Sequence, residues 1–219
     1  MNVAAIIFDF DGVIVESVDI KTRAFATLFE AEPASVVEAA VNYHLANAGL
    51  SRYAKFAYVY EELLRKPLDD ATVVALDSRF SELVTERVVA CPLVAGARSY
   101  LDARSAEVPL HLVSATPEGE LRGIVQRRGL TCYFEDVLGS PAAKPDNVRR
   151  IIERHGYDPA CVPLIGDGRQ DYEAAREHGL PFIGRVPPGH DNPFPAGAST
   201  VPDLVALARL WPDIVTNPR

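Results

Sequence analysis

Five short runs of consecutive apolar residues constrain the fold of this chain more than any other feature. They are VAAIIFDF from Val3, VPLHLVSAT from Val108, YFEDVLGS from Tyr133, CVPLIGDG from Cys161 and LPFIGR from Leu180. None of them alternates apolar with polar residues along its length. Each run is therefore typical of a strand that is buried on both faces of a parallel sheet.

Helical patterns separate the last four runs, namely PEGELRGIVQRRG from Pro117, KPDNVRRIIERHG from Lys144 and GRQDYEAAREHG from Gly168. Early prolines and terminal glycines mark the ends of these patterns, as expected for helices. A short strand near Thr200 and a helix to about Leu210 would complete the core. The alternation predicts an α/β fold with a doubly wound parallel sheet, Rossmann-like, and right-handed crossovers.

The segment between the first two predicted strands departs from this alternation. A βαβ crossover requires only one helix, whereas residues 18–89 carry about four helical patterns. These are DIKTRAFATLFEA, PASVVEAAVNYHLANAG, SRYAKFAYVYEELLRK and LDDATVVALDSRFSELVTERVVA. We therefore expect a helical cap domain over residues 16–94, inserted after the first strand, and a core domain made of residues 1–15 and 95–219.

The composition argues against several classes of protein. The net charge of −8 disfavours a nucleic-acid binder, because such proteins are usually basic. The first apolar run is broken at Asp9 and no run is long enough to span a bilayer, which argues against a signal peptide and a membrane protein. Cys91, Cys132 and Cys161 are too widely spaced to indicate disulfides or a zinc site. We expect a cytoplasmic monomer or homodimer without a nucleic-acid or membrane partner.

Polar side chains follow the predicted strands at the points where the strands end. In open α/β sheets this carboxyl edge is where ligands bind. The side chains expected there include Asp9, Asp11, Ser114, Lys144, Asp167 and Asp171. Four carboxylates at one edge repel one another unless a cation neutralises them, and Mg²⁺ prefers oxygen ligands. Asp9, Asp11 and Asp167 are predicted to hold magnesium, while Lys144 and Ser114 remain to bind a phosphate.

Four segments of the chain resemble, in order, the motifs of the haloacid dehalogenase superfamily, in its phosphatase and phosphomutase branch. They are DFDGV at 9–13, SAT at 114–116, SPAAKP at 140–145 and GDGRQD at 166–171. The resemblance implies an enzyme, a phosphoric monoester hydrolase that depends on magnesium. Its substrate would be a small phosphorylated metabolite, such as a sugar phosphate or a similar organic phosphate, and its intermediate an aspartyl-phosphate.

The resemblance also implies a role for each motif residue. Asp9 would be the nucleophile, and Asp11 the general acid and base. Ser114, Ala115 and Lys144 would bind the transferring phosphoryl group. The residues placed at the magnesium ion are Asp9, Asp11, Asp167 and Asp171, the last in a supporting position.

The stretch GLSRYAKF, residues 49–56, resembles a cap segment of β-phosphoglucomutase-like members. There, an arginine at the position of Arg52 grips a distal phosphate. Lys21 stands where those mutases carry a histidine, and this departure favours a hydrolase. Lys21, Arg52 and Lys55 are the candidates for reading the substrate, although each is also typical of a solvated helix face.

Two alternatives to a hydrolase follow from the same residues. A sugar phosphomutase would hold phosphate at both ends of its substrate. A non-catalytic binding or regulatory module would be expected to lack the nucleophile or a metal ligand. Thr116 is expected to cap the helix that begins near Pro117, and His44 and His111 are expected to be ordinary packing or surface residues.

Overall fold

The computed structural model describes residues 3–216, and the side chains of residues 3–211. It contains one sheet of six parallel strands in the order β3-β2-β1-β4-β5-β6. The strands are β1 (Ile6–Phe8), β2 (Leu110–Pro117), β3 (Asp136–Ser140), β4 (Leu164–Gly166), β5 (Phe182–Arg185) and β6 (Ser199–Val201). The prediction of a doubly wound, Rossmann-like α/β fold is therefore confirmed.

Helices cover both faces of this sheet. They are α5 (Ala97–Ser105), α6 (Glu118–Arg127), α7 (Lys144–His155), α8 (Arg169–His178) and α9 (Leu204–Thr216). On one face, Val148 of α7 packs in a cluster with Ile7 and Leu164. On the other face, Phe8 and Leu112 pack with residues of α5, α6 and α9. Ile7 and Phe8 separate in this way because successive side chains of a strand point to opposite faces.

Helix α5 is not among the helices that the sequence analysis predicts. Its sequence, ARSYLDARS, is mostly polar, and only Ala97, Tyr100 and Leu101 are buried. These three residues lie at helical spacing and face the sheet, whereas the rest of the helix faces solvent. Three buried residues in nine leave a weak signal in the sequence, because short segments carry little periodicity.

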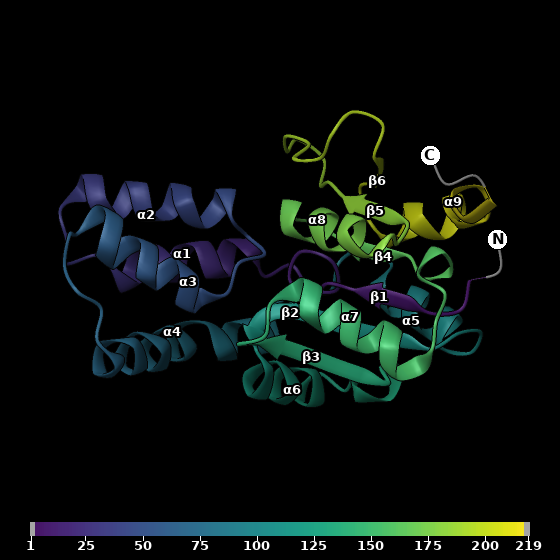
Figure 1. Cartoon of the computed structure of the whole chain (residues 1–219), viewed down its shortest axis with the longest axis horizontal. Coiled ribbons are helices and arrows are strands. Elements are labelled where there is room, and N and C mark those ends of the chain that lie inside the picture. Colours follow the sequence, from purple (N-terminus) through teal and green to yellow (C-terminus); the bar gives the residue numbers. More distant parts are fainter. Residues whose placement is uncertain (1–2, 217–219) are drawn as a thin grey trace.

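A second group of helices lies beside the sheet, drawn purple to blue in Figure 1. These helices, here called the cap, are α1 (Val18–Leu28), α2 (Ala34–Ala46), α3 (Arg52–Tyr58) and α4 (Asp70–Ala90). Their core contains Phe25, Phe56 and Phe80, whose rings lie 5.8–6.3 Å apart between centroids. Helix α3 ends earlier than predicted and continues as a π-helical turn, Val59–Leu63. Within residues 3–216, no helix combines the length and apolar character needed to cross a bilayer.

Candidate active site

The chain turns sharply just after β1, at the carboxyl edge of the sheet. The Asp9 N–H donates to the Ile165 carbonyl at 2.8 Å, which extends the pairing of β1 with β4 by one residue. Gly12 then adopts a φ of +72°, and a Cβ at this position would lie 2.0 Å from Asp167 Oδ2. Glycine is therefore required here both for the left-handed backbone and for the close approach to Asp167.

Lys144, the first residue of α7, lies between two buried carboxylates. Its Nζ is 3.0 Å from Asp9 Oδ1 and donates a short hydrogen bond to Asp171 Oδ1. The other oxygen of Asp171 accepts the Gly168 N–H at 3.0 Å, at the start of α8. Although burial disfavours the ammonium, Asp171 and Asp9 raise the pKa of Lys144. Lys144 is therefore charged and ties α7 and α8 to the end of β1.

Asp9, Asp167 and Asp171 form a cluster whose ligand oxygens lie within 4.8 Å of one another. Within the described part of the chain, Asp9 Oδ1 is buried and makes no hydrogen bond of good geometry, even to the Lys144 ammonium. Burial raises the pKa of Asp9 to about 7 although Lys144 opposes the shift, and burial together with Asp9 raises the pKa of Asp167. One lysine does not compensate these three carboxylates, of which Asp9 and Asp171 are buried and Asp167 is half-buried, and this all-oxygen donor set fits a hard divalent cation such as Mg²⁺.

Asp11 lies in a different environment, because hydrogen-bond donors surround it. Ser17 Oγ donates to Oδ1 at 2.6 Å, and Lys21 Nζ donates to Oδ2 at 2.5 Å. The hydroxyls of Thr116 and Ser114 donate to Oδ2 at 3.1 and 3.2 Å. Burial alone raises the pKa of Asp11, but Lys21 and these hydrogen bonds outweigh it and lower the pKa below its usual value. Asp11 is therefore ionised next to the Lys21 ammonium.

The prediction that Thr116 caps helix α6 is wrong. Strand β2 continues through Pro117, which takes the N-cap position, so the Thr116 side chain remains on the strand. Its hydroxyl accepts a hydrogen bond from Lys21 at 2.7 Å and donates to Asp11. In an extended strand, residues two apart share a face. The position of Thr116 two residues after Ser114 was thus a signal for its place in the site.

A cavity of about 60 Å³ lies where the cap meets this edge of the sheet. The candidate residues that line it are Asp9, Asp11, Lys21, Arg52, Lys55, Ala115 and Asp167. Ser114, Lys144 and Asp171 do not line it; Ser114 contacts Asp11, Lys144 contacts Asp9, and Asp171 contacts Lys144. The structure therefore brings the core candidates and the cap candidates to a single cavity.

Arg52 is buried in the cap, and its guanidinium binds the core helix α6. Nη2 and Nη1 donate to the two carboxylate oxygens of Glu120 at 2.6 and 3.1 Å. Nη1 also donates to Ser81 at 2.7 Å and to Asp77 at 3.2 Å. The guanidinium stacks over the Phe80 ring, with 4.7 Å between Arg52 Cζ and the ring centroid. We call the Arg52–Glu120 contact the latch. Glu120 was missed from the sequence, because an acidic residue in the first turn of a helix is common.

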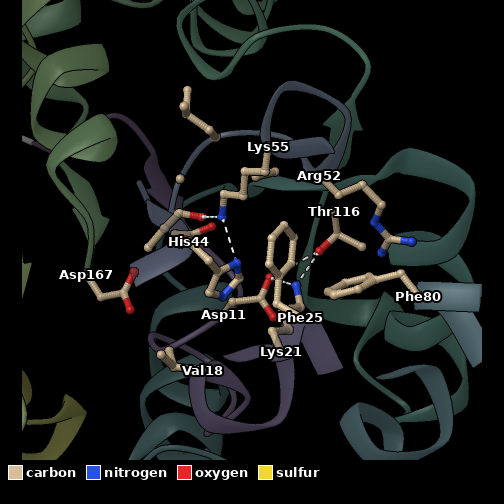
Figure 2. Close-up of a pocket in the computed structure, with 15 residues that line it drawn as sticks. Asp11, Val18, Lys21, Phe25, His44, Arg52, Lys55, Phe80, Thr116 and Asp167 are labelled. Carbon is tan, nitrogen blue, oxygen red and sulfur yellow. Dashed lines mark hydrogen bonds and ion pairs between the residues drawn. The ribbon is translucent and has the colours of Figure 1, made fainter. Parts of the chain in front are cut away.

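Lys55 is the third cationic residue of the cap at the cavity. Its Nζ donates to the Ala48 carbonyl at 3.2 Å and lies 3.3 Å from His44 Nδ1 (Figure 2). Burial lowers the pKa of Lys55 to about 7, and burial together with Lys55 lowers the pKa of His44 to about 3. His44 stacks on Phe25 with 4.8 Å between ring centroids, so it is a packing residue, as expected, but it also lines the cavity.

The fold and the cluster of carboxylates are those of an α/β protein with a candidate active site, and comparison with known proteins identifies its family. A family model described as haloacid dehalogenase-like hydrolase matches residues 3–179. The chain is 28% identical over 187 residues to a phosphoglycolate phosphatase of Synechococcus elongatus, and the match covers 80% of each chain. The chain therefore belongs to the haloacid dehalogenase-like hydrolase family, and the prediction of a phosphatase of this kind is confirmed.

Solved structures share the fold over nearly the whole chain. A predicted phosphoglycolate phosphatase from Haemophilus somnus superposes with a TM-score of 0.76 at 17% identity, covering 96% of this chain and 99% of that one. The HAD-hydrolase YfnB from Bacillus subtilis, bound to magnesium, superposes with a TM-score of 0.70, again at 17% identity and with coverage of 96% and 99%. These structures contain both the sheet and the cap, so the cap belongs to the shared fold.

Proposed function

We propose that this protein is a magnesium-dependent phosphohydrolase of small phosphorylated metabolites that works through an aspartyl-phosphate at Asp9. The observation that carries the proposal is the contrast between Asp9 and Asp11 at one cavity. Asp9 has a buried oxygen that makes no hydrogen bond of good geometry and lies beside other carboxylates, whereas Asp11 accepts hydrogen bonds from four side chains. Two neighbouring carboxylates in such different environments suit two different tasks in one reaction.

In the first half-reaction, a carboxylate oxygen of Asp9 attacks the phosphorus atom. The bond from phosphorus to the leaving oxygen breaks, and that oxygen takes a proton from Asp11. Asp11 must gain this proton beforehand from solvent that reaches the cavity it lines, because Lys21 favours the Asp11 carboxylate and stays charged beside it. Lys144 stays charged between Asp9 and Asp171 and offsets the negative charge of the transferring group.

In the second half-reaction, Asp11 takes a proton from water and the water oxygen attacks the same phosphorus atom. The bond between phosphorus and Asp9 breaks, which releases inorganic phosphate and restores the Asp9 carboxylate. Asp9 and Asp167 would hold the magnesium ion, and Asp171 would fix Lys144 beside them. When bound, the ion supplies positive charge to the phosphoryl oxygens.

The latch supports hydrolysis over phosphomutase chemistry. A mutase needs a cation to hold the distal phosphate, and the candidate was Arg52. That guanidinium already binds Glu120, Ser81 and Asp77. The cavity is also small, which favours a short substrate. Because the relatives are phosphoglycolate phosphatases, phosphoglycolate is the first candidate, together with small sugar phosphates.

A screen of phosphorylated metabolites with Mg²⁺ tests this function. We expect inorganic phosphate to be released from small monoesters, phosphoglycolate among them, and no isomerised sugar phosphate to form. Released phosphate is measured by a colorimetric assay, and the organic product is identified by ³¹P and ¹H NMR. Isomerisation of a hexose phosphate without release of phosphate would sink the hydrolase proposal.

Addition of Mg²⁺ to the metal-free protein is expected to raise Tm. A ligand that binds only the native state stabilises it by about 2.7 kcal/mol at a concentration of 100 times Kd. Differential scanning fluorimetry in EDTA and in excess Mg²⁺ measures the shift. Asp167→Asn should reduce the shift, whereas Asp146→Asn, an exposed position on α7, should retain it. An equal shift in all three proteins would place the ion elsewhere.

A further inference from the structure

Two of the three cap cations at the cavity already have carboxylate partners. Lys21 pairs with Asp11 at 2.5 Å, and Arg52 pairs with Glu120 at 2.6 Å. Lys55 lines the same cavity with an exposed fraction of only 3%. Among the described residues, no carboxylate lies within 4.0 Å of its Nζ. A buried amine without a paired carboxylate is costly as a cation, and an anion bound in the cavity would offset that cost.

The hydrogen bonds of Lys55 leave one donor for a ligand. An ammonium has three N–H groups and no acceptor. Ala48 accepts one of them, and His44 Nδ1 accepts a second in the tautomer of the neutral imidazole that carries its proton on Nε2. Neither partner carries a negative charge. The third N–H is therefore available to a group in the cavity that Lys55 lines.

The geometry points to Lys55 as the residue that binds the carboxylate of a short phosphorylated carboxylic acid, at the leaving-group end of the cavity. This inference rests on the proposed phosphohydrolase function. Lys55 belongs to α3 of the cap, whereas Asp9 and Lys144 belong to the core. Figure 2 shows the Lys55 amine directed toward His44, and the Arg52 guanidinium beside Phe80 at the far side from Asp167.

The chemistry of the two side chains favours a carboxylate over a second phosphate. A guanidinium binds phosphate through two parallel hydrogen bonds, and the fork of Arg52 is committed to the latch. Lys55 offers a single free N–H and a point charge, which suits one carboxylate oxygen. An anion bound beside Lys55 also favours its protonated form, whose pKa burial has lowered to about 7.

The experiment compares two esters of the same length, phosphoglycolate and hydroxyethyl phosphate, which differ only in the carboxylate. Wild-type protein is expected to prefer phosphoglycolate. Lys55→Met is expected to lower kcat/KM for phosphoglycolate by about 10²-fold, the usual scale for a hydrogen bond to a charged group. The loss should appear mainly in KM, because the contact is the same in the ground state and the transition state. The loss on hydroxyethyl phosphate should be far smaller.

Lys55→Met is expected to fold, because the lowered pKa of Lys55 means that the buried ammonium destabilises the native state. Folding lowers the pKa of Lys55 from 10.5 to about 7, so the unfolded chain holds this proton more tightly. This difference costs stability at pH 7 and disappears only as the pH rises above 10.5. Lys55→Met should therefore have a Tm at pH 7 no lower than wild type. Lys66 is exposed and lies between the π-helical turn and α4, so Lys66→Met is the matched control and should keep the substrate preference.

Each outcome supports or overturns the assignment of Lys55. The assignment is supported if Lys55→Met loses the preference for phosphoglycolate over hydroxyethyl phosphate and Lys66→Met keeps this preference. Equal losses on both esters overturn it, because Lys55 would then bind the phosphoryl group. A wild-type enzyme that releases phosphate from both esters equally well also overturns it and leaves the phosphohydrolase function standing. Absence of phosphate release from every ester tested with Mg²⁺ would overturn the proposed function itself.

Discussion

Asp9→Asn is expected to abolish phosphate release and to lower kcat on the order of 10⁴-fold or more, as removal of a nucleophile usually does. An amide cannot form the aspartyl-phosphate, and it is also a poorer metal ligand than the carboxylate it replaces. The rate is measured with Mg²⁺ and phosphoglycolate. Acid-quenched enzyme should contain bound phosphate in wild type and none in the variant.

The fold of this variant is expected to survive, which separates chemistry from stability. Folding raises the pKa of Asp9 from 3.8 to about 7, so the carboxylate costs stability increasingly as the pH rises through this range. At pH 8 in EDTA, Asp9→Asn removes that cost and should not lower Tm. Asp19→Asn, an exposed aspartate in the first turn of α1, is the control that should retain full activity. Normal turnover in Asp9→Asn would rule out the covalent mechanism.

The core of the site could be predicted because it depends on strand ends. Runs without alternation marked the parallel strands, and the carboxyl ends of such strands must share one edge. Asp9, Lys144 and Asp171 come from three separate segments, yet Lys144 contacts both carboxylates in the structure. The order in which strands and helices alternate along the chain was therefore enough to predict that these residues lie close together.

The cap side could not be predicted in the same way. Whether Arg52 is free depends on Glu120 lying opposite it, and residues 52 and 120 meet only once the cap docks on the core. Similarly, the neighbours of Lys55 within the described part of the chain, such as His44, are set by how the cap packs around Phe25. Sequence spacing places such residues on a helix face, but it does not say what the opposite surface carries.

Lys144→Met is expected to cause the largest loss of stability among single substitutions at this site. Removal of one partner from a buried ion pair typically costs about 3–5 kcal/mol, because the remaining charge stays buried without compensation. Here two carboxylates, Asp9 and Asp171, lose the same cation. Urea unfolding followed by circular dichroism measures the free energy of unfolding. Methionine keeps the length of the apolar stem, so the variant tests the charge and not the volume.

Lys66→Met provides the comparison that isolates burial. Lys66 lies 3.6 Å from Glu32 and its side chain is 57% exposed, whereas that of Lys144 is 3% exposed. An exposed pair contributes about 0–1 kcal/mol, so the two variants should differ several-fold in their losses. Mg²⁺ should recover part of the loss in Lys144→Met, because it would neutralise Asp9, one of the two carboxylates that lose the lysine, and none of the loss in Lys66→Met. Similar losses in the free energy of unfolding in both variants would contradict this prediction. Asp9 and Asp171 would then take up protons when Lys144 is removed, and the proposed role of Lys144 would be limited to the reaction.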